Sequence, residues 1–352
     1  MNGNSNKQCE CQKKSHLRWI DAAKGVAIIA VIIDHSTGIL FSNRIISLCS
    51  YFSVTVFVFL AGITSYYSSE RHQKENIQNE IIRKAKSIIF SYGIATCAYQ
   101  LVIHKRWELS EYIRHLLQFD ITPPFYFIVF YIQLIIISPY IYRLLNRWKG
   151  KKEKYIHCIM VVLSVIISVL CIRHTFILDV WGGGKYLLGG SYLIVYFLGE
   201  ISAHYGTFLG TSKNLLKMLI FIFVVFTCMV WLVKYEFRLD VWLDEPFGPG
   251  LNPPGITLMI YGVCIVLLLY YIFSYIEVTN LRFIKGFYMI LSYIGYYSLY
   301  IFLYHKLVLD YFLINFYISN IWMKRVVYIF AMLGIPIFIK AAIDKVKQYM
   351  RQ

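Results

Sequence analysis

The chain has 352 residues, of which 58% are hydrophobic and 15% are charged, and its mean hydropathy is +0.57. Because a soluble domain is about a quarter charged, this composition excludes an ordinary soluble protein and indicates helices embedded in a membrane. The formal net charge of +16 does not indicate a nucleic-acid partner, since the basic residues fall in short segments between apolar runs and the sequence holds no nucleic-acid-binding motif.

Long apolar runs recur along the whole chain, many of them close to the ~20 residues that a helix needs to cross a bilayer. They predict an all-α fold, a polytopic membrane bundle of about ten transmembrane helices. The predicted spans are residues 20–40, 47–67, 84–104, 124–145, 155–173, 186–204, 214–234, 256–276, 287–305 and 321–341.

Basic residues cluster on alternate connections between these spans, which is typical of segments on the cytoplasmic side. An even number of spans with both termini in the cytoplasm satisfies this rule. We therefore expect three parts: a basic cytoplasmic tail without fixed structure at residues 1–17, a single transmembrane domain at 18–343, and a second basic cytoplasmic tail at 344–352.

Eight cysteines are scattered along the chain, and most lie inside apolar runs, where cysteine acts as a small hydrophobic residue. The pair Cys9-x-Cys11 in the tail is a weak signal for a metal or for redox chemistry. Because the chain lacks a Cys/His cluster with the spacing of a zinc site, we expect it to bind no metal.

The first predicted span reads WIDAAKGVAIIAVIIDHS at residues 19–36 and carries several ionisable side chains. Such a group inside a span costs roughly 2.5–3.5 kcal/mol on insertion scales, so it is a candidate functional residue. On a helix, Lys24 and His35 lie within about 20° of one line and about 16 Å apart, and Asp21 lies about 40° from that line. Asp34 points about 100° aside, toward a neighbouring helix.

One face of this helix therefore carries Asp21, Lys24 and His35, with its basic end near the cytoplasm. A neutral imidazole suits acid–base chemistry near pH 7, which makes His35 a candidate catalytic residue. Asp21 and Lys24 have a second interpretation, as an ion pair at the cytoplasmic interface of the membrane.

The other histidine well inside an apolar run is His305, in the segment LSYIGYYSLYIFLYHKLV at residues 291–308. Ser298 shares its helical face, but about 10 Å of helix rise separates the two residues, which is too far for a Ser/His nucleophile pair. His305 is either a second functional histidine or an interfacial residue beside Lys306.

These segments resemble the acyltransferase-3 family of integral-membrane acyltransferases, in the branch of fucose 4-O-acetylase-like and polysaccharide intercellular adhesin-type proteins. The stretch at residues 19–36 resembles the opening block of that branch, and Lys24 and His35 stand at its basic-x10-His pattern. Later blocks are similar to VFVFLAGITSYY (56–67), RKAKSIIFSYG (83–93), PPFYFIVFYIQLIIISP (123–139), GGSYLIVYFLGE (189–200) and LSYIGYYSLYIFLYH (291–305).

The resemblance implies an O-acyltransferase that carries an acyl group, usually acetyl from cytosolic acetyl-CoA, to a glycan hydroxyl. Acyl-CoA is then a co-substrate, and no bound cofactor is expected. The candidate catalytic residues are His35 as the base, with Lys24, Asp21 and His305. Arg83 and Lys86 are candidates for the donor phosphates, although positive-inside topology also explains them. The candidate substrate-binding residues are Asp34, Tyr126, Ser298 and Tyr304.

The expected partners are a glycan or lipid-linked saccharide acceptor and membrane lipid, and the expected location is the inner or plasma membrane of a bacterium. The alternative is a saccharide transporter or flippase of a polysaccharide export system, since transporters also bury ionisable residues. Transporters are often built from repeated halves. Residues 20–173 and 186–341 show no convincing repeat, which favours the enzyme.

Overall fold

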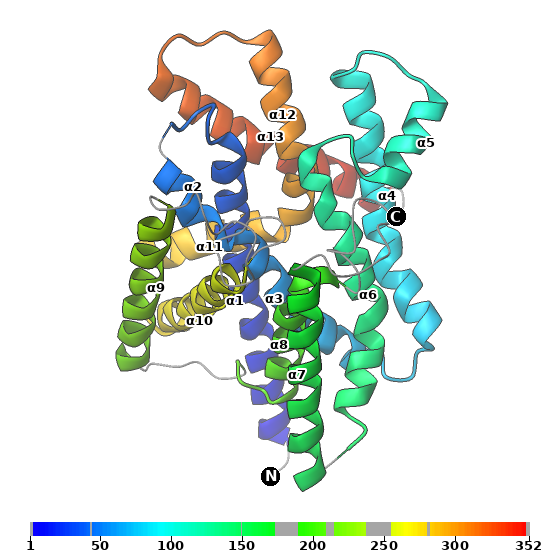
Figure 1. Ribbon diagram of the computed structural model, residues 1–352, viewed down its shortest axis with the longest axis vertical. Coiled ribbons are helices and arrows are strands. Elements are labelled where there is room, and N and C mark those ends of the chain that lie inside the picture. Colours follow the sequence, from blue (N-terminus) through cyan, green and yellow to red (C-terminus); the bar gives the residue numbers. More distant parts are fainter. Residues whose placement is uncertain are drawn as a thin grey trace.

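The computed structural model describes residues 3–42, 44–148, 150–172, 189–208, 215–236, 255–279 and 282–349 (Figure 1). Within these ranges the fold is helical and contains no β-strand, as the sequence predicts. The elements are α1 Gly3–Ser36, α2 Arg44–Ser50, α3 Phe52–Arg71, α4 Ile77–Val102, α5 Leu109–Gln118, the 3-10 turn η1 Pro123–Phe125, α6 Tyr126–Leu145, α7 Lys151–Ile172, α8 Leu193–His204, α9 Leu215–Glu236, α10 Ile256–Val278, α11 Arg282–Tyr296, α12 Ser298–Asn315 and α13 Ile321–Tyr349.

Five helical segments of the described chain are long and apolar enough to cross a membrane, and a sixth is added if α11 and α12 form one broken span. The five segments are Leu48–Arg71, Pro123–Leu145, Lys152–Cys171, Ile256–Val278 and Ile321–Lys345. An all-helical membrane protein is therefore confirmed. The larger number of about ten spans and the cytoplasmic position of both termini stay predictions.

The predicted span 287–305 is not one straight helix. It breaks at Tyr297, where α11 ends and α12 begins, and the two helix axes differ by 76°. As a result His305 stands in the middle of α12 rather than at the end of a span. Helix α1 begins at Gly3 and includes most of residues 1–17. The division into one transmembrane domain and two cytoplasmic tails stays a prediction.

Helix α1 runs through the bundle and packs along α11, α3, α10 and α12 (Figure 1). Two glycines permit its close crossing with α11. A Cβ atom on Gly295 would overlap the carbonyl oxygen of Asp21, and one on Gly25 would overlap the carbonyl oxygen of Leu291. This crossing brings Asp21 and Lys24, in the middle of α1, beside the break between α11 and α12.

Candidate active site

His35 and His305, the two histidines that the sequence places well inside apolar runs, meet in the folded chain. Their rings lie edge to face, with centroids 5.1 Å apart and planes at 72°. His35 is in the last turn of α1 and is half-buried, whereas His305 is fully buried in α12. The contact favours the functional interpretation of His305 over the interfacial one.

The hydrogen bonds of His305 define which of its nitrogens is free. Its Nδ1 lies 2.8 Å from the carbonyl oxygen of Phe302 and 3.1 Å from that of Ile301. Because a carbonyl only accepts, Nδ1 carries the proton and Nε2 holds the lone pair. That Nε2 atom is buried and has no hydrogen-bond partner in the part of the chain that the structure describes. An unpartnered buried acceptor is rare in folded proteins and is available to a substrate or to a neighbouring N–H group.

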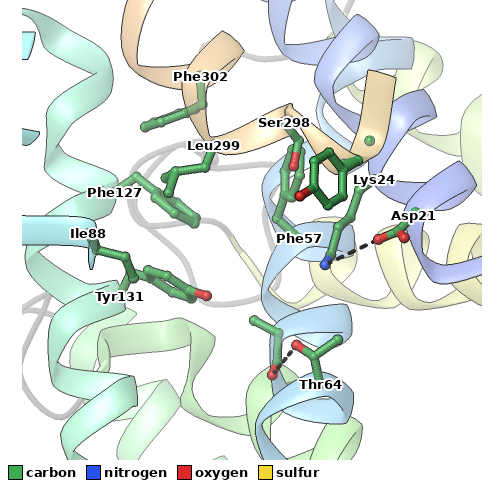
Figure 2. Close-up of a pocket in the computed structure, with 13 residues that line it drawn as sticks. Asp21, Lys24, Phe57, Thr64, Ile88, Phe127, Tyr131, Ser298, Leu299 and Phe302 are labelled. Carbon is green, nitrogen blue, oxygen red and sulfur yellow. Dashed lines mark hydrogen bonds and ion pairs between the residues drawn. The ribbon is translucent and has the colours of Figure 1, made fainter. Parts of the chain in front are cut away.

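A cavity of about 270 Å³ lies beside the crossing of α1 and α11, with walls from α3, α4, α6 and α12 (Figure 2). Lys24, Asp21 and Ser298 contribute polar groups to its lining. Lys24 Nζ lies 3.8 Å from Asp21 Oδ1, and both side chains are partly exposed. In Figure 2 the Lys24 ammonium and the Tyr131 hydroxyl point into the same space from opposite sides. Phe57 and other apolar side chains complete the walls.

Phe302 connects this cavity to the histidine pair. Its side chain lines the cavity, and its ring centroid lies 6.0 Å from that of His305. Its carbonyl accepts the hydrogen bond from His305 Nδ1. On the other side, Lys24 lines the cavity about 16 Å of helix rise before His35. The cavity therefore lies between Lys24 on α1 and the turn of α12 that precedes His305, and its lining does not include either histidine.

A family model described as an acyltransferase domain matches residues 17–341, which is nearly the whole chain. The chain belongs to the acyltransferase-3 family. With five described helical segments able to cross a membrane, it is a membrane acyltransferase. The family expected from the sequence is thereby confirmed. A search of the curated proteins and a search of the solved structures each found no match.

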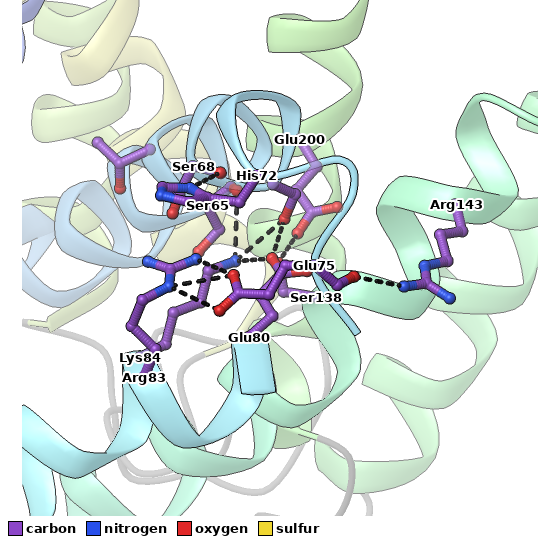
Figure 3. Close-up of polar contacts among 12 residues, drawn as sticks. Ser65, Ser68, His72, Glu75, Glu80, Arg83, Lys84, Ser138, Arg143 and Glu200 are labelled. Carbon is purple, nitrogen blue, oxygen red and sulfur yellow. Dashed lines mark hydrogen bonds and ion pairs between the residues drawn. The ribbon is translucent and has the colours of Figure 1, made fainter. Parts of the chain in front are cut away.

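The acyltransferase places the two predicted donor-binding residues outside the cavity lining. Arg83 is exposed and binds Glu75, with its Nη2 3.0 Å and its Nε 3.2 Å from Glu75 Oε2 (Figure 3). Lys86, on the same helix, is exposed. A guanidinium already paired with a carboxylate has less charge to offer a phosphate, although an exposed ion pair exchanges easily with solvent. The role of both residues in donor binding stays a prediction.

The predicted substrate-binding residues separate into two groups in the acyltransferase. Ser298 lines the cavity, whereas Asp34, Tyr126 and Tyr304 do not. Asp34 and Tyr304 are half-buried, and each directly precedes one of the two histidines. Tyr126 opens α6, directly after η1. The site therefore draws its polar groups mainly from α1 and from the first half of α12.

The sequence analysis missed a buried polar layer between α3, α4, α6 and α8 (Figure 3). Lys84 Nζ lies 2.7 Å from Glu80 Oε1 and donates to Ser69 Oγ at 3.1 Å, while Ser69 donates to Glu80. The fully buried Glu200 accepts from Ser138 Oγ at 2.7 Å. One signal was present, because Glu200 ends an apolar run in which an acid is costly.

Proposed function

We propose that this acyltransferase moves an acetyl group from acetyl-CoA on the cytoplasmic side to a hydroxyl of a cell-surface or lipid-linked glycan. The contact between His35 and His305, with His305 one helical turn after the cavity-lining Phe302, carries this proposal. The resemblance to the fucose 4-O-acetylase-like branch supports the choice of acetyl and of a glycan, and with it a bacterial plasma membrane.

In the proposed reaction the acceptor oxygen forms a bond to the thioester carbonyl carbon, and the carbon–sulfur bond breaks. His35 takes the hydroxyl proton, and CoA leaves as a thiolate that takes up a proton to become the thiol. A positioned imidazole typically contributes a rate factor of about 10²–10⁴ in such a step. Since His35 is only half-buried, an acceptor can reach it.

His305 has a different role in this proposal. Its Nε2 lone pair is directed by the two carbonyl hydrogen bonds at Nδ1. By accepting the N–H of His35, it would hold that ring so that the other nitrogen serves as the base. A second histidine in this position supports base catalysis without itself touching the donor.

The cavity fits one end of the donor. Its volume of about 270 Å³ is just below the range for small-molecule sites, about 300–1,000 Å³, which suits the thioester arm rather than the whole of CoA. Lys24 would balance negative charge there, and Asp21 would hold the ammonium in place. With about ten spans and cytoplasmic termini, Lys24 would stand at the cytoplasmic end and His35 nearer the opposite surface.

The test compares surface glycan from cells that make the wild-type chain or its His35→Ala variant. We expect the variant to lose ester-linked acetyl while the amount of exported glycan stays normal. His104→Ala is the matched control, because His104 is exposed and outside the site. Loss of export with acetylation intact would refute the enzyme and support the transporter alternative.

A further inference from the structure

Glu153, His157 and His204 come together where α7 begins and α8 ends, outside the lining of the cavity described above. One ligand atom from each residue lies within 4.8 Å of the other two. His157 is buried and the other two are half-buried. We propose that these three side chains form a binding site for a divalent transition metal, with Zn²⁺ as the best-suited ion.

The hydrogen bonds of His204 leave room for a proton or a metal ion between its ring and Glu153. His204 Nδ1 lies 2.9 Å from the hydroxyl of Tyr66, and that hydroxyl donates its proton to Asn146 Oδ1 at 3.4 Å. If the Tyr66 hydroxyl keeps this bond to Asn146, it accepts from His204 Nδ1–H, and the lone pair of Nε2 faces Glu153 Oε1 at 3.0 Å; if it donates to Nδ1 instead, Nε2–H donates to Glu153. A lone pair opposite a carboxylate is unfavourable unless a proton or a metal lies between them. Two ligands of one tetrahedral zinc ion at ~2.1 Å stand about 3.4 Å apart, so the ring and the carboxylate need to separate by only about 0.4 Å to admit the ion.

His157 is oriented as a ligand by the group behind it. Its Nε2 lies 3.2 Å from the carbonyl oxygen of Leu145, so that Nε2 carries the proton and Nδ1 holds the lone pair. The present neighbour of Nδ1 is the hydroxyl of Tyr205, at 2.7 Å. Tyr205 is 50% exposed, so its hydroxyl can turn toward solvent and leave Nδ1 to a metal. An imidazole that donates one N–H to a carbonyl and offers its other nitrogen is the usual arrangement of a metal-binding histidine.

The donor set selects the ion. Two imidazole nitrogens and one carboxylate oxygen form a three-ligand set that leaves a zinc ion one open position. Mg²⁺ and Ca²⁺ prefer oxygen ligands and are poorly matched to it. A bound metal would join the start of α7 to the end of α8 and, through Tyr66, to α3. The proposal departs from the sequence expectation of no metal, because the ligands come from two helices and include no cysteine.

The alternative is a metal-free contact in which His204 Nε2–H donates to Glu153. The two possibilities are separated with the purified full-length chain in detergent, carrying no polyhistidine tag. We expect about one zinc per chain by elemental analysis. After removal with a chelator, added Zn²⁺ should rebind and raise the thermal unfolding midpoint, whereas Mg²⁺ should not. Added Co²⁺ should give the visible absorption of a nitrogen- and oxygen-ligated ion.

Variants assign the binding to these residues. Glu153→Gln and His157→Gln keep side-chain size and hydrogen-bonding capacity, and each should weaken Zn²⁺ at least tenfold. Tyr66→Phe removes the acceptor for His204 Nδ1–H and should weaken Zn²⁺ about tenfold. The controls His104→Gln and Tyr67→Phe should bind as the wild type does. Absence of a zinc-dependent shift in the wild-type chain, or an equal shift in Glu153→Gln, would overturn the proposal and leave the metal-free contact.

Discussion

The rings of His35 and His305 lie edge to face with centroids 5.1 Å apart, although one residue closes α1 and the other stands in the middle of α12. If His305 orients His35, the two residues act as a unit. We expect His35→Gln and His305→Gln each to lower kcat of acetyl transfer about a hundredfold or more. The double variant should be little worse than the more damaged single variant.

The measurement is transfer of labelled acetyl from acetyl-CoA in membranes that contain equal amounts of each variant. His104→Gln, at an exposed histidine, should keep wild-type activity. If the fold-losses in kcat of the two single variants multiply in the double variant, the two histidines act independently.

Close packing at the crossing of α1 and α11 depends on Gly295. An added Cβ would overlap the carbonyl oxygen of Asp21 and lie close to the backbone nitrogen of Gly25. Since backbone cannot yield as a side chain can, Gly295→Ala should destabilise the protein by about 1–3 kcal/mol or more. The measurement is the midpoint of thermal unfolding in detergent, which should be lower for Gly295→Ala than for the wild type.

Gly286 gives a control on the same helix. A Cβ on Gly286 would meet nothing within 4 Å, and alanine is the better helix former by about 1 kcal/mol. Gly286→Ala should therefore leave the midpoint unchanged or raise it. Equal losses for the two variants would mean that the close crossing is not the cause.

The buried ion pair between Glu80 and Lys84 allows us to predict how removal of one or both charges changes the stability of the protein. Glu80→Leu would leave the Lys84 ammonium buried without its carboxylate and should cost about 3–5 kcal/mol of stability. Removing both charges in Glu80→Leu/Lys84→Met should recover most of that loss. A double-mutant cycle on thermal unfolding measures the coupling between Glu80 and Lys84. If the double variant loses as much stability as the two single variants together, the two charges are not coupled.

The same pair predicts a dependence on pH. Burial acts to raise the pKa of Glu80, which precedes the predicted span 84–104, but hydrogen bonds from Lys84 and Ser69 outweigh burial and bring the pKa below its ordinary value of 4.5. A carboxyl with a lowered folded-state pKa contributes stability that is complete above its unfolded-state pKa and is lost as pH falls through the folded-state pKa. The difference in midpoint between the wild type and Glu80→Gln should therefore be constant near neutrality and narrow below about pH 4.5. A difference that widens on acidification would contradict this sign.

Lys24 and Arg83 are two candidate contacts for the donor, and the structure ranks them. Lys24 lines the cavity, whereas Arg83 is outside it and bound to Glu75. Loss of a charged hydrogen bond costs about 1.5–3 kcal/mol, so Lys24→Gln should raise KM for acetyl-CoA about tenfold or more. Arg83→Gln should change KM by about twofold or less, because an exposed pair contributes little. Steady-state kinetics on both variants decides the order, and a larger effect at Arg83 would place the donor at the start of α4 instead.

Much of the fold could be predicted because membrane helices leave strong local signals. Apolar length predicted helices throughout the described chain, and the cost of a buried imidazole singled out His35 and His305. Their contact could not be predicted, since it depends on how α1 packs against α12. The break in the helix at Tyr297 could not be predicted either, because the apolar run continues through this position without a proline. Span 287–305 was therefore predicted as one helix, with His305 near its end.

The remaining site residues show where local reasoning ends. The resemblance predicts Ser298 as a substrate-binding residue; Ser298 lines the cavity, and its role in binding stays a prediction. The resemblance and its basic charge make Arg83 a donor-binding candidate, but its ion-pair partner Glu75 precedes the start of α4 and cannot be paired with it from periodicity. The grouping of Glu153 and His157 with His204 needed α7 and α8 to pack side by side.

The break between α11 and α12 has an electrostatic consequence for the cavity. A single helix through this region would consume every backbone N–H group in bonds to the preceding turn. Because α12 begins anew at Ser298, which lines the cavity and has no side-chain cap before it, the first amides of α12 are released there. The macrodipole of the eighteen-residue α12 thus places its positive end, roughly half an elementary charge, at this cavity, and α11, whose last residues Gly295 and Tyr296 also line it, places its negative end there. The bend therefore brings two helix ends of opposite sign to one cavity, beside the full charges of Lys24 and Asp21.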